Sequence, residues 1–231
     1  MQLVAAVRAA LRAGFYAVLD RDDEQLARTL VGPGGARLLQ VRLKPAAVDD
    51  IVRVGRMARR VCDEAGARLI INDRIDIALA VGADGVHLGQ TDLPLDVACS
   101  LVGMKLAIGI STHALEQVEH AARLVPAYIA YGPIFATSTK QNPDPVQGIT
   151  ALRAAVRAAG EVPVVAIGGI TPATAMQVYA ARVTSICAIS AVNAAPDPGL
   201  AARAFARHSP WLKNTGAYHV LRRYPAVLQD E

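Results

Sequence analysis

The sequence is poor in cysteine and in aromatic residues. Its three cysteines, Cys62, Cys99 and Cys187, stand far apart without CxxC spacing, so we expect neither a disulfide framework nor a structural zinc site. Aromatic residues make up only 4% of the 231 residues, and the basic residues behind the net charge of +4 form no runs. This pattern argues against nucleic acid as a partner and leaves an anionic small molecule as a candidate ligand.

Long apolar runs are missing as well. Each apolar run is broken by glycine or by charge before the roughly 18 residues of a membrane span. The N-terminus places Arg8 and Arg12 at helical spacing and lacks the order of charge, apolar block and cleavage site of a secretory signal. We therefore expect a cytoplasmic protein without membrane contact. Because 53% of the residues are apolar, the chain can still bury a sizeable core.

Short apolar runs alternate with segments of helical spacing along most of the chain. The strand-like runs are Phe15 to Leu19, Leu38 to Val41, Arg68 to Ile71, Gly85 to Leu88, Leu106 to Ile110, Ala127 to Tyr131, Val164 to Ile167 and Ser185 to Ile189. Segments with a helical period lie between them, such as Val48 to Ala65 and Leu115 to Leu124. Near-continuous apolar strands with short connections are typical of a parallel sheet covered by helices.

Eight such units in about 200 residues predict a (β/α)₈ TIM barrel, an α/β fold with one eight-stranded parallel sheet. A doubly wound open sheet is the alternative. We place a single barrel domain at residues 1–207, followed by a tail at 208–231 that would serve as a homo-oligomer contact, a barrel cap or a disordered end. Thr171 before Pro172 predicts a capped helix start, a device that Asp197 repeats.

A barrel of this kind carries its chemistry at the carboxyl ends of the strands. Polar or glycine residues follow seven of the predicted strands. Gln40, Arg42 and Lys44 alternate along the end of the second strand and beyond it, Asn72 and Asp73 come after the third, Gln90 and Asp92 after the fourth, and Ser111 and His113 after the fifth. The sixth is followed by the loop Gly132 to Gly148, with Thr137, Thr139 and Lys140, the seventh by Gly168 and Gly169, and the eighth by Ser190.

Several of these residues have a purely structural alternative. Asp73 is also a suitable helix cap, and Asp92 a suitable turn residue. The glycine pair at Gly168 and Gly169 can serve close packing alone. His87, inside an apolar strand, is expected to be a packed histidine of the core or rim rather than a catalyst.

The aspartates are more informative as a pair. Asp73 and Asp92 lie at neighbouring strand ends, so their carboxylates can approach one ion from two sides. Two carboxylates with open positions suit Mg²⁺, whereas zinc would favour histidine or cysteine. Arg42 and Lys44 add positive charge on the adjacent strand, and together these groups describe a cradle for pyrophosphate.

A second anion site is expected on the far side of the barrel mouth. The loops after strands seven and eight, with Gly168, Gly169, Ile189 and Ser190, are where barrels frequently bind a phosphate through backbone N–H groups. Two separate anion sites imply two phosphorylated reactants.

The motifs QVRLK, INDR, ALAVGADGVHLGQTDLP, IGISTH, YGPIFATSTK, AIGGIT and ISAV occur in that order. In order and spacing they resemble those of thiamine phosphate synthase, over Phe15 to Phe205. The resemblance implies a Mg²⁺-dependent transferase that joins hydroxymethylpyrimidine pyrophosphate to the ring nitrogen of a thiazole phosphate, releasing pyrophosphate and thiamine monophosphate.

The same resemblance implies roles for individual residues. Pyrimidine pyrophosphate would be bound by Gln40, Arg42, Lys44, Asn72, Ser111 and Lys140, the metal by Asp73 and Asp92, the thiazole phosphate by Thr137 and Thr139, and a phosphate by the backbone at Gly168, Ile189 and Ser190. Among these, Lys140, Arg42, Lys44 and Ser111 are expected to act in catalysis. The hydroxyl-rich loop would then clamp both anions.

Two alternatives remain. A thiazole tautomerase shares the scaffold and would place the catalytic weight on His113, without pyrophosphate or Mg²⁺. A non-catalytic barrel that binds a phosphorylated ligand is the other. Asp73, Asp92 and Lys140 count against the tautomerase.

Overall fold

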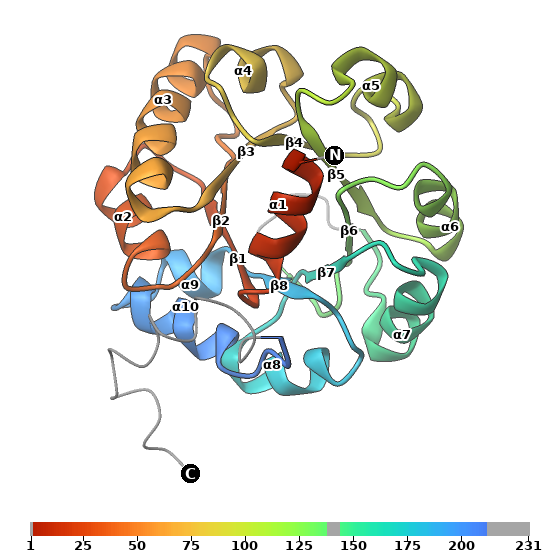
Figure 1. Ribbon diagram of the computed structural model, residues 1–231. Helices are drawn as coiled ribbons and strands as arrows, with labels where there is room; N and C mark the ends of the chain where they lie inside the picture. Colours follow the sequence, from red (N-terminus) through yellow and green to blue (C-terminus); the bar gives the residue numbers. More distant parts are fainter. Residues whose placement is uncertain (1, 138–143, 212–231) are drawn as a thin grey trace.

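The computed structural model describes residues 2–137 and 144–211. Strands and helices alternate through this part of the chain (Figure 1). The strands are β1 (Phe15–Leu19), β2 (Leu38–Val41), β3 (Arg68–Asn72), β4 (Gly85–Leu88), β5 (Ala107–Thr112), β6 (Tyr128–Tyr131), β7 (Val164–Ile167) and β8 (Ser185–Cys187). The helices are α1 (Gln2–Leu11), α2 (Glu24–Val31), α3 (Val48–Ala65), α4 (Ile75–Ala80), α5 (Leu95–Val102), α6 (Leu115–Arg123), α7 (Gly148–Ala158), α8 (Pro172–Tyr179), α9 (Ser190–Asn193) and α10 (Pro198–Ala206).

The strands form one closed parallel barrel. Each strand pairs with the next, and β8 returns to β1 with Phe15 opposite Ile186 and Tyr16 opposite Cys187. Most of the helices form a ring around the outside of the sheet (Figure 1). The (β/α)₈ prediction is therefore confirmed, and the closed strand order excludes an open doubly wound sheet. The domain boundary at residue 207 stays a prediction, because residues 212–231 lie outside the described part.

The predicted strands differ from the observed ones mainly at their ends. The bounds of β1, β2, β4 and β7 are those expected from the apolar runs. The eighth run was expected to extend to Ile189, but β8 ends at Cys187. The reason is that Ile189 already has a helical backbone, with φ of −104° and ψ of −75°, and caps α9. A continuous apolar run cannot by itself show where a strand gives way to a helix.

Two apolar layers hold the barrel together. The larger layer lies between the strands and the surrounding helices. The smaller layer fills the barrel interior and includes Val7 and Leu11 of α1, both 0% exposed. Arg8 of the same helix donates from Nε to the carbonyl of Ala127 at 3.2 Å and from Nη2 to that of Pro126 at 2.9 Å. Because these carbonyls precede β6, α1 closes the amino end of the barrel, and the carboxyl end stays open.

The predicted helix caps are present. Thr171 forms a capping box with Thr174 at the start of α8. Asp197 accepts the N–H of Leu200 at 2.8 Å, so α10 begins at Pro198. Such caps satisfy N–H groups that have no acceptor within the helix. None of the helices within residues 2–137 and 144–211 is both long enough and apolar enough to cross a membrane.

Candidate active site

A cavity of about 380 Å³ lies at the carboxyl ends of the strands. All the predicted site residues within the described ranges line it: Gln40, Arg42, Lys44, Asn72, Asp73, Asp92, Ser111, Thr137, Gly168, Ile189 and Ser190. Thr139 and Lys140 belong to residues 138–143, which lie outside the described part of the chain. Gln40, Asn72 and Ser111 lie within the last residues of β2, β3 and β5, and the others follow the strands. The closed barrel thus brings together, in one cavity, residues from the carboxyl ends of seven different strands and from the segments that follow them.

Asp73 and Asp92 direct their carboxyl groups to the same point. The backbone of Asp73 has a φ of +62°, and its N–H donates to the carbonyl of His87 at 2.8 Å, which fixes the turn after β3. After β4, the N–H of Gly89 donates to Oδ2 of Asp92 at 2.7 Å. The two aspartate side chains are within hydrogen-bonding contact of each other. Backbone contacts in both loops therefore hold the pair.

The electrostatics of this pair suit a divalent cation. Burial raises the pKa of Asp92 above its ordinary value, the hydrogen bond and charge of Asp73 raise it further, and the N–H of Gly89 and the charge of Lys44 oppose these effects. Two ionised carboxylates at one point repel each other, and a cation between them would remove that repulsion.

The set of available donors narrows the type of metal. No cluster of three or more His, Cys, Asp or Glu side chains that could hold a metal is formed by residues 2–137 and 144–211. An ion held by Asp73 and Asp92 would complete its coordination with water and ligand oxygens, which is the usual habit of Mg²⁺. The residues present therefore fit Mg²⁺ better than a closed zinc site.

Lys44 reaches the carboxylate pair from the end of β2. Its Nζ lies 2.5 Å from Oδ2 of Asp73, and half of the lysine side chain is exposed. Arg42, two residues earlier, lines the same cavity, as expected for alternate positions of an extended chain. Positive charge therefore borders the aspartates on one side.

A continuous chain of hydrogen bonds runs from Gln40 through the barrel interior to Ser111. Nε2 of Gln40 donates to the hydroxyl of Tyr16 at 2.7 Å, and that hydroxyl lies 2.7 Å from the hydroxyl of Tyr128. Nδ1 of His87 lies 3.0 Å from the Tyr128 hydroxyl, and Nε2 lies 2.8 Å from Oγ of Ser111. Two predicted ligands are thus joined by three buried side chains.

Burial explains the protonation of His87 in this chain. Desolvation lowers its pKa to about 4, and the charges of Arg42 and Lys44 act in the same direction, although Asp92 opposes them. The imidazole is therefore neutral at pH 7. The histidine is packed, at 8% exposed, as the sequence predicted, but it also lines the cavity.

Tyr16 and Tyr128 were not predicted as part of the site. Both stand in runs that read as apolar strands, where a tyrosine is as suitable as a phenylalanine. The alternation of residues along a barrel strand was a usable signal. Tyr128 lies two residues before Ala130, and both side chains belong to the apolar layer inside the barrel. Alternate residues of a barrel strand face the interior, and a buried tyrosine hydroxyl there needs a polar partner.

The glycine pair after β7 is required for packing. Gly168 and Gly169 have φ values of +96° and +64°, which favour glycine. A Cβ at Gly168 would overlap Pro133, and one at Gly169 would overlap the carbonyl of Ala136. The structural alternative for this pair therefore holds. Both glycines also line the cavity, so a binding role for their backbone is compatible with the packing role.

His113 also lines the cavity. Its Nδ1 donates to the carbonyl of Gly132 at 2.6 Å, with Nδ1 as the protonated nitrogen, and its Nε2 lies 3.5 Å from Oδ2 of Asp144. Asp144 lines the cavity and was not predicted from the sequence. These contacts join the loop after β5 to both ends of the loop after β6.

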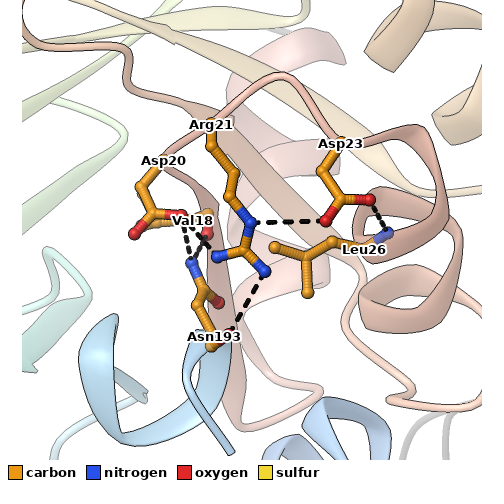
Figure 2. Close-up of polar contacts among 6 residues, drawn as sticks. All are labelled: Val18, Asp20, Arg21, Asp23, Leu26 and Asn193. Atoms are coloured by element: carbon orange, nitrogen blue, oxygen red, sulfur yellow. Dashed lines mark hydrogen bonds and ion pairs between the residues drawn. The ribbon is translucent and has the colours of Figure 1, made fainter.

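A polar cluster outside the cavity holds α9 in place (Figure 2). Nδ2 of Asn193 donates to the carbonyl of Val18 and to Oδ1 of Asp20, both at 2.9 Å. Nη2 of Arg21 donates to the carbonyl of Asn193 at 3.3 Å, and its Nε lies 3.3 Å from Oδ2 of Asp23. We call Asp20, Arg21 and Asn193 the seam cluster, because it joins the loop after β1 to the helix after β8.

Comparison with known proteins shows the family to which this sequence is similar. The sequence matches the family described as thiamine monophosphate synthase over residues 2–192. It is similar to the thiamine-phosphate synthases of Methanoregula boonei, 43% identical over 199 residues that cover 84% of this chain and 91% of that relative, and of Moorella thermoacetica, 43% identical over 170 residues that cover 74% and 80%. The solved thiamine phosphate pyrophosphorylase from Pyrococcus furiosus is similar with a TM-score of 0.78 and 32% identity, covering 93% of this chain and 99% of that one.

Proposed function

The chain belongs to the thiamine monophosphate synthase family, and from that premise we propose that it joins hydroxymethylpyrimidine pyrophosphate to a thiazole phosphate. A synthase of this type is a transferase that acts on small molecules. The observation that supports this specific reaction is the arrangement of residues around the cavity. A carboxylate pair bordered by cations lies on one side, and the glycine-rich and α9 backbone lies on the other.

The pyrophosphate group would bind beside Asp73 and Asp92. Arg42 and Lys44 border this point, and their charges would hold and stabilise the leaving pyrophosphate as negative charge develops on it. Asp73 and Asp92 would hold Mg²⁺, and the bound ion would neutralise part of the same charge. The contact of Lys44 with Asp73 supports this arrangement, because it places a lysine within reach of an oxygen bound to an ion that the aspartates would hold.

The reaction needs no nucleophilic side chain. The bond between the methylene carbon and the pyrophosphate oxygen breaks, and the electron pair leaves with pyrophosphate. The electron-rich aminopyrimidine stabilises the methylene cation, and the thiazole nitrogen donates its electron pair to that carbon. The protein would hold the nitrogen in line and exclude water that would otherwise capture the cation. Apolar side chains of the cavity wall, such as Val18, Val165 and Ile167, support such exclusion.

The phosphate of the thiazole would bind at the opposite wall. Ile189 and Ser190 lie at the start of α9, and Gly168 follows β7. Loops after the last two strands of a barrel are a frequent phosphate site because their N–H groups point into the mouth. Thr137 at the same cavity would add a hydroxyl, and Thr139 and Lys140 remain predicted ligands.

The direct test is to mix both substrates with the purified protein, with and without Mg²⁺, and to measure the products. We expect thiamine monophosphate and pyrophosphate in equal amounts, with Mg²⁺ required. Isomerisation of a thiazole phosphate without release of pyrophosphate would instead indicate a tautomerase. Binding of both substrates without turnover would indicate a non-catalytic barrel, and either result contradicts the proposal.

A further inference from the structure

The hydrogen-bonded chain inside the barrel links two sides of the cavity through residues that the proposed reaction leaves without a role. We call Tyr16, Tyr128 and His87 the relay. Gln40 and Ser111, at its two ends, line the cavity, whereas Tyr128 does not and is 0% exposed. Rings in the relay also pack on one another, since Tyr128 makes an edge contact with Tyr16 and stacks on His87. Packing therefore holds the three side chains in one arrangement.

The hydrogen bonds of the relay have a single consistent direction, starting at Gln40. Nε2 of Gln40 is a donor, so the oxygen of Tyr16 accepts at this end. Tyr16 then donates its own hydrogen to Tyr128, the other polar partner of its hydroxyl. Were Tyr128 to donate instead, the Tyr16 hydrogen would have no acceptor in the relay, and an unsatisfied buried donor is unfavourable.

The direction of the hydrogen bond between Tyr16 and Tyr128 also fixes the direction at the other end of the relay. Because Tyr128 accepts from Tyr16, its hydrogen goes to Nδ1 of His87. A neutral imidazole carries one ring proton, and with Nδ1 accepting, that proton sits on Nε2 and is donated to Oγ of Ser111. The hydrogen of Ser111 is then not used by the relay, so the serine can donate it toward the cavity.

From this order we propose that the relay is a positioning device, which presents Gln40 to the ligand as an acceptor through its carbonyl oxygen and presents Ser111 as a donor. The choice of ligand rests on the proposed function, since an aminopyrimidine pyrophosphate offers an amino group to an acceptor and anionic oxygens to a donor. The direction of the relay does not rest on it. Tyr128 is a positioning residue, because it would act only through Tyr16 and His87.

The first test reads the direction in the wild-type protein. Histidine labelled with ¹⁵N distinguishes the protonated ring nitrogen from the unprotonated one by NMR. We expect His87 to be the tautomer with its proton on Nε2, whether or not the protein turns over the proposed substrates. A proton on Nδ1 would mean that the relay runs the other way and would overturn the inference.

The second test removes the central hydroxyl with Tyr128→Phe, which keeps the ring. We expect KM for the pyrimidine pyrophosphate to rise about tenfold, because two ligands lose their fixed orientation, while KM for the thiazole phosphate stays within about twofold. Tyr179→Phe is the matched control. It also removes a buried tyrosine hydroxyl, but that hydroxyl donates to the carbonyl of Gly14 before β1, at the closed end of the barrel.

The control separates positioning from loss of stability. If Tyr128→Phe leaves both KM values unchanged, or if Tyr179→Phe raises the same KM equally, the positioning role is wrong. If wild-type protein forms no thiamine monophosphate at all, the proposed function fails, and the tautomer of His87 still decides the direction of the relay. The two failures are therefore distinguishable.

Discussion

Asp84 illustrates how single buried charges stabilise the closed end of the barrel. It precedes β4 and is 5% exposed. Its carboxylate accepts from Nη1 of Arg59 at 2.6 Å, from Nη1 of Arg68 at 2.9 Å and from the N–H of Leu69 at 2.8 Å. One side chain thus joins α3, β3 and β4 at a place remote from the cavity.

We expect Asp84→Ala to lower the free energy of unfolding by about 3 to 5 kcal/mol, because it leaves Arg59 without its buried partner and the N–H of Leu69 without an acceptor. Asp22→Ala is the control, since Asp22 pairs with Arg53 at 2.5 Å but both side chains are more than half exposed. Exposed pairs contribute about 0 to 1 kcal/mol. Urea denaturation measures the free energy of unfolding of both variants. Equal losses of stability would show that Asp84 is no more important than an exposed aspartate.

The same carboxylate predicts a pH dependence of stability. Burial acts to raise the pKa of Asp84, but hydrogen bonds from Arg59, Leu69 and Arg68 outweigh burial and hold the pKa below its ordinary value. Asp84 therefore makes its full contribution to the free energy of unfolding above the pKa of an aspartate in the unfolded chain, about 3.9. That contribution is lost as the pH falls through the lower pKa of Asp84 in the folded protein. The difference in free energy of unfolding between wild type and Asp84→Asn should shrink from about pH 6 to about pH 2. A constant difference would show that Asp84 does not titrate in this way.

Single residues differ in how far the sequence reveals them. Asp73 and Asp92 could be singled out because each lies in the loop after an apolar strand and the two strands are neighbours. Tyr16 and Tyr128 were missed, because a tyrosine in an apolar strand looks like a phenylalanine unless the alternation of the barrel strand is used to place its hydroxyl in the interior. Asp144 was missed because it is an ordinary loop residue until the fold brings it to His113.

The seam cluster connects two secondary-structure elements, since it holds α9 against the end of β1 (Figure 2). We expect Asn193→Ala to weaken binding of the thiazole phosphate about tenfold, because Ile189 and Ser190 begin the helix that Asn193 holds, and small displacements of binding groups are costly. Calorimetric titration of each substrate measures this. Affinity for the pyrimidine pyrophosphate should change by less than about twofold, since its proposed ligands lie on other loops.

A matched control for the seam cluster is Asp197→Ala. It removes the cap of α10 and should cost stability of about 1 kcal/mol, but no proposed ligand lies on that helix. If both variants weaken the binding of thiazole phosphate equally, general destabilisation of the protein explains the effect. If Asn193→Ala changes neither affinity, the seam cluster does not position α9 for binding.

Elements were predictable where period and length agree, as in α3, whose bounds match the expected Val48 to Ala65. The end of β8 was not, because an apolar run continues through the start of α9. The seam cluster was also beyond prediction, since Asn193 and Asp20 are distant in sequence and meet only when β8 pairs with β1. Barrel closure creates that contact.

Across the barrel as a whole, the end closed by α1 contributes to stability, and the proposed chemistry takes place at the opposite end. Leu11 is fully buried at the closed end, so Leu11→Ala should lower the free energy of unfolding by about 2 to 5 kcal/mol. kcat should be nearly unchanged where the variant remains folded, because the cavity lies at the other end. Leu200→Ala on α10, where the side chain is 43% exposed, should change stability by less than about 0.5 kcal/mol. Thermal unfolding and kinetics check both, and a large loss of kcat in Leu11→Ala would contradict this division between the two ends.

The architecture and the gathering of site residues followed from sequence because a closed parallel barrel places every strand end at one mouth. The resemblance to the family then assigned ligands to those positions. The ligand roles, Mg²⁺ and a homo-oligomer remain predictions, because each depends on a molecule besides this chain. The same holds for the clamp at Thr139 and Lys140 and for the tail, which lie outside residues 2–137 and 144–211 except for the first four tail residues.

We expect Asp73 and Asp92 to share one Mg²⁺ that is needed for loss of pyrophosphate. The most direct test is the rate of thiamine monophosphate formation against Mg²⁺ concentration for wild type, Asp92→Asn and, as a control, Asp96→Asn, an acidic residue of α5 that does not line the cavity. We predict that Asp92→Asn loses about 10² to 10³ in rate and needs more Mg²⁺, while Asp96→Asn behaves as wild type. A near wild-type rate for Asp92→Asn at saturating Mg²⁺ would contradict this expectation.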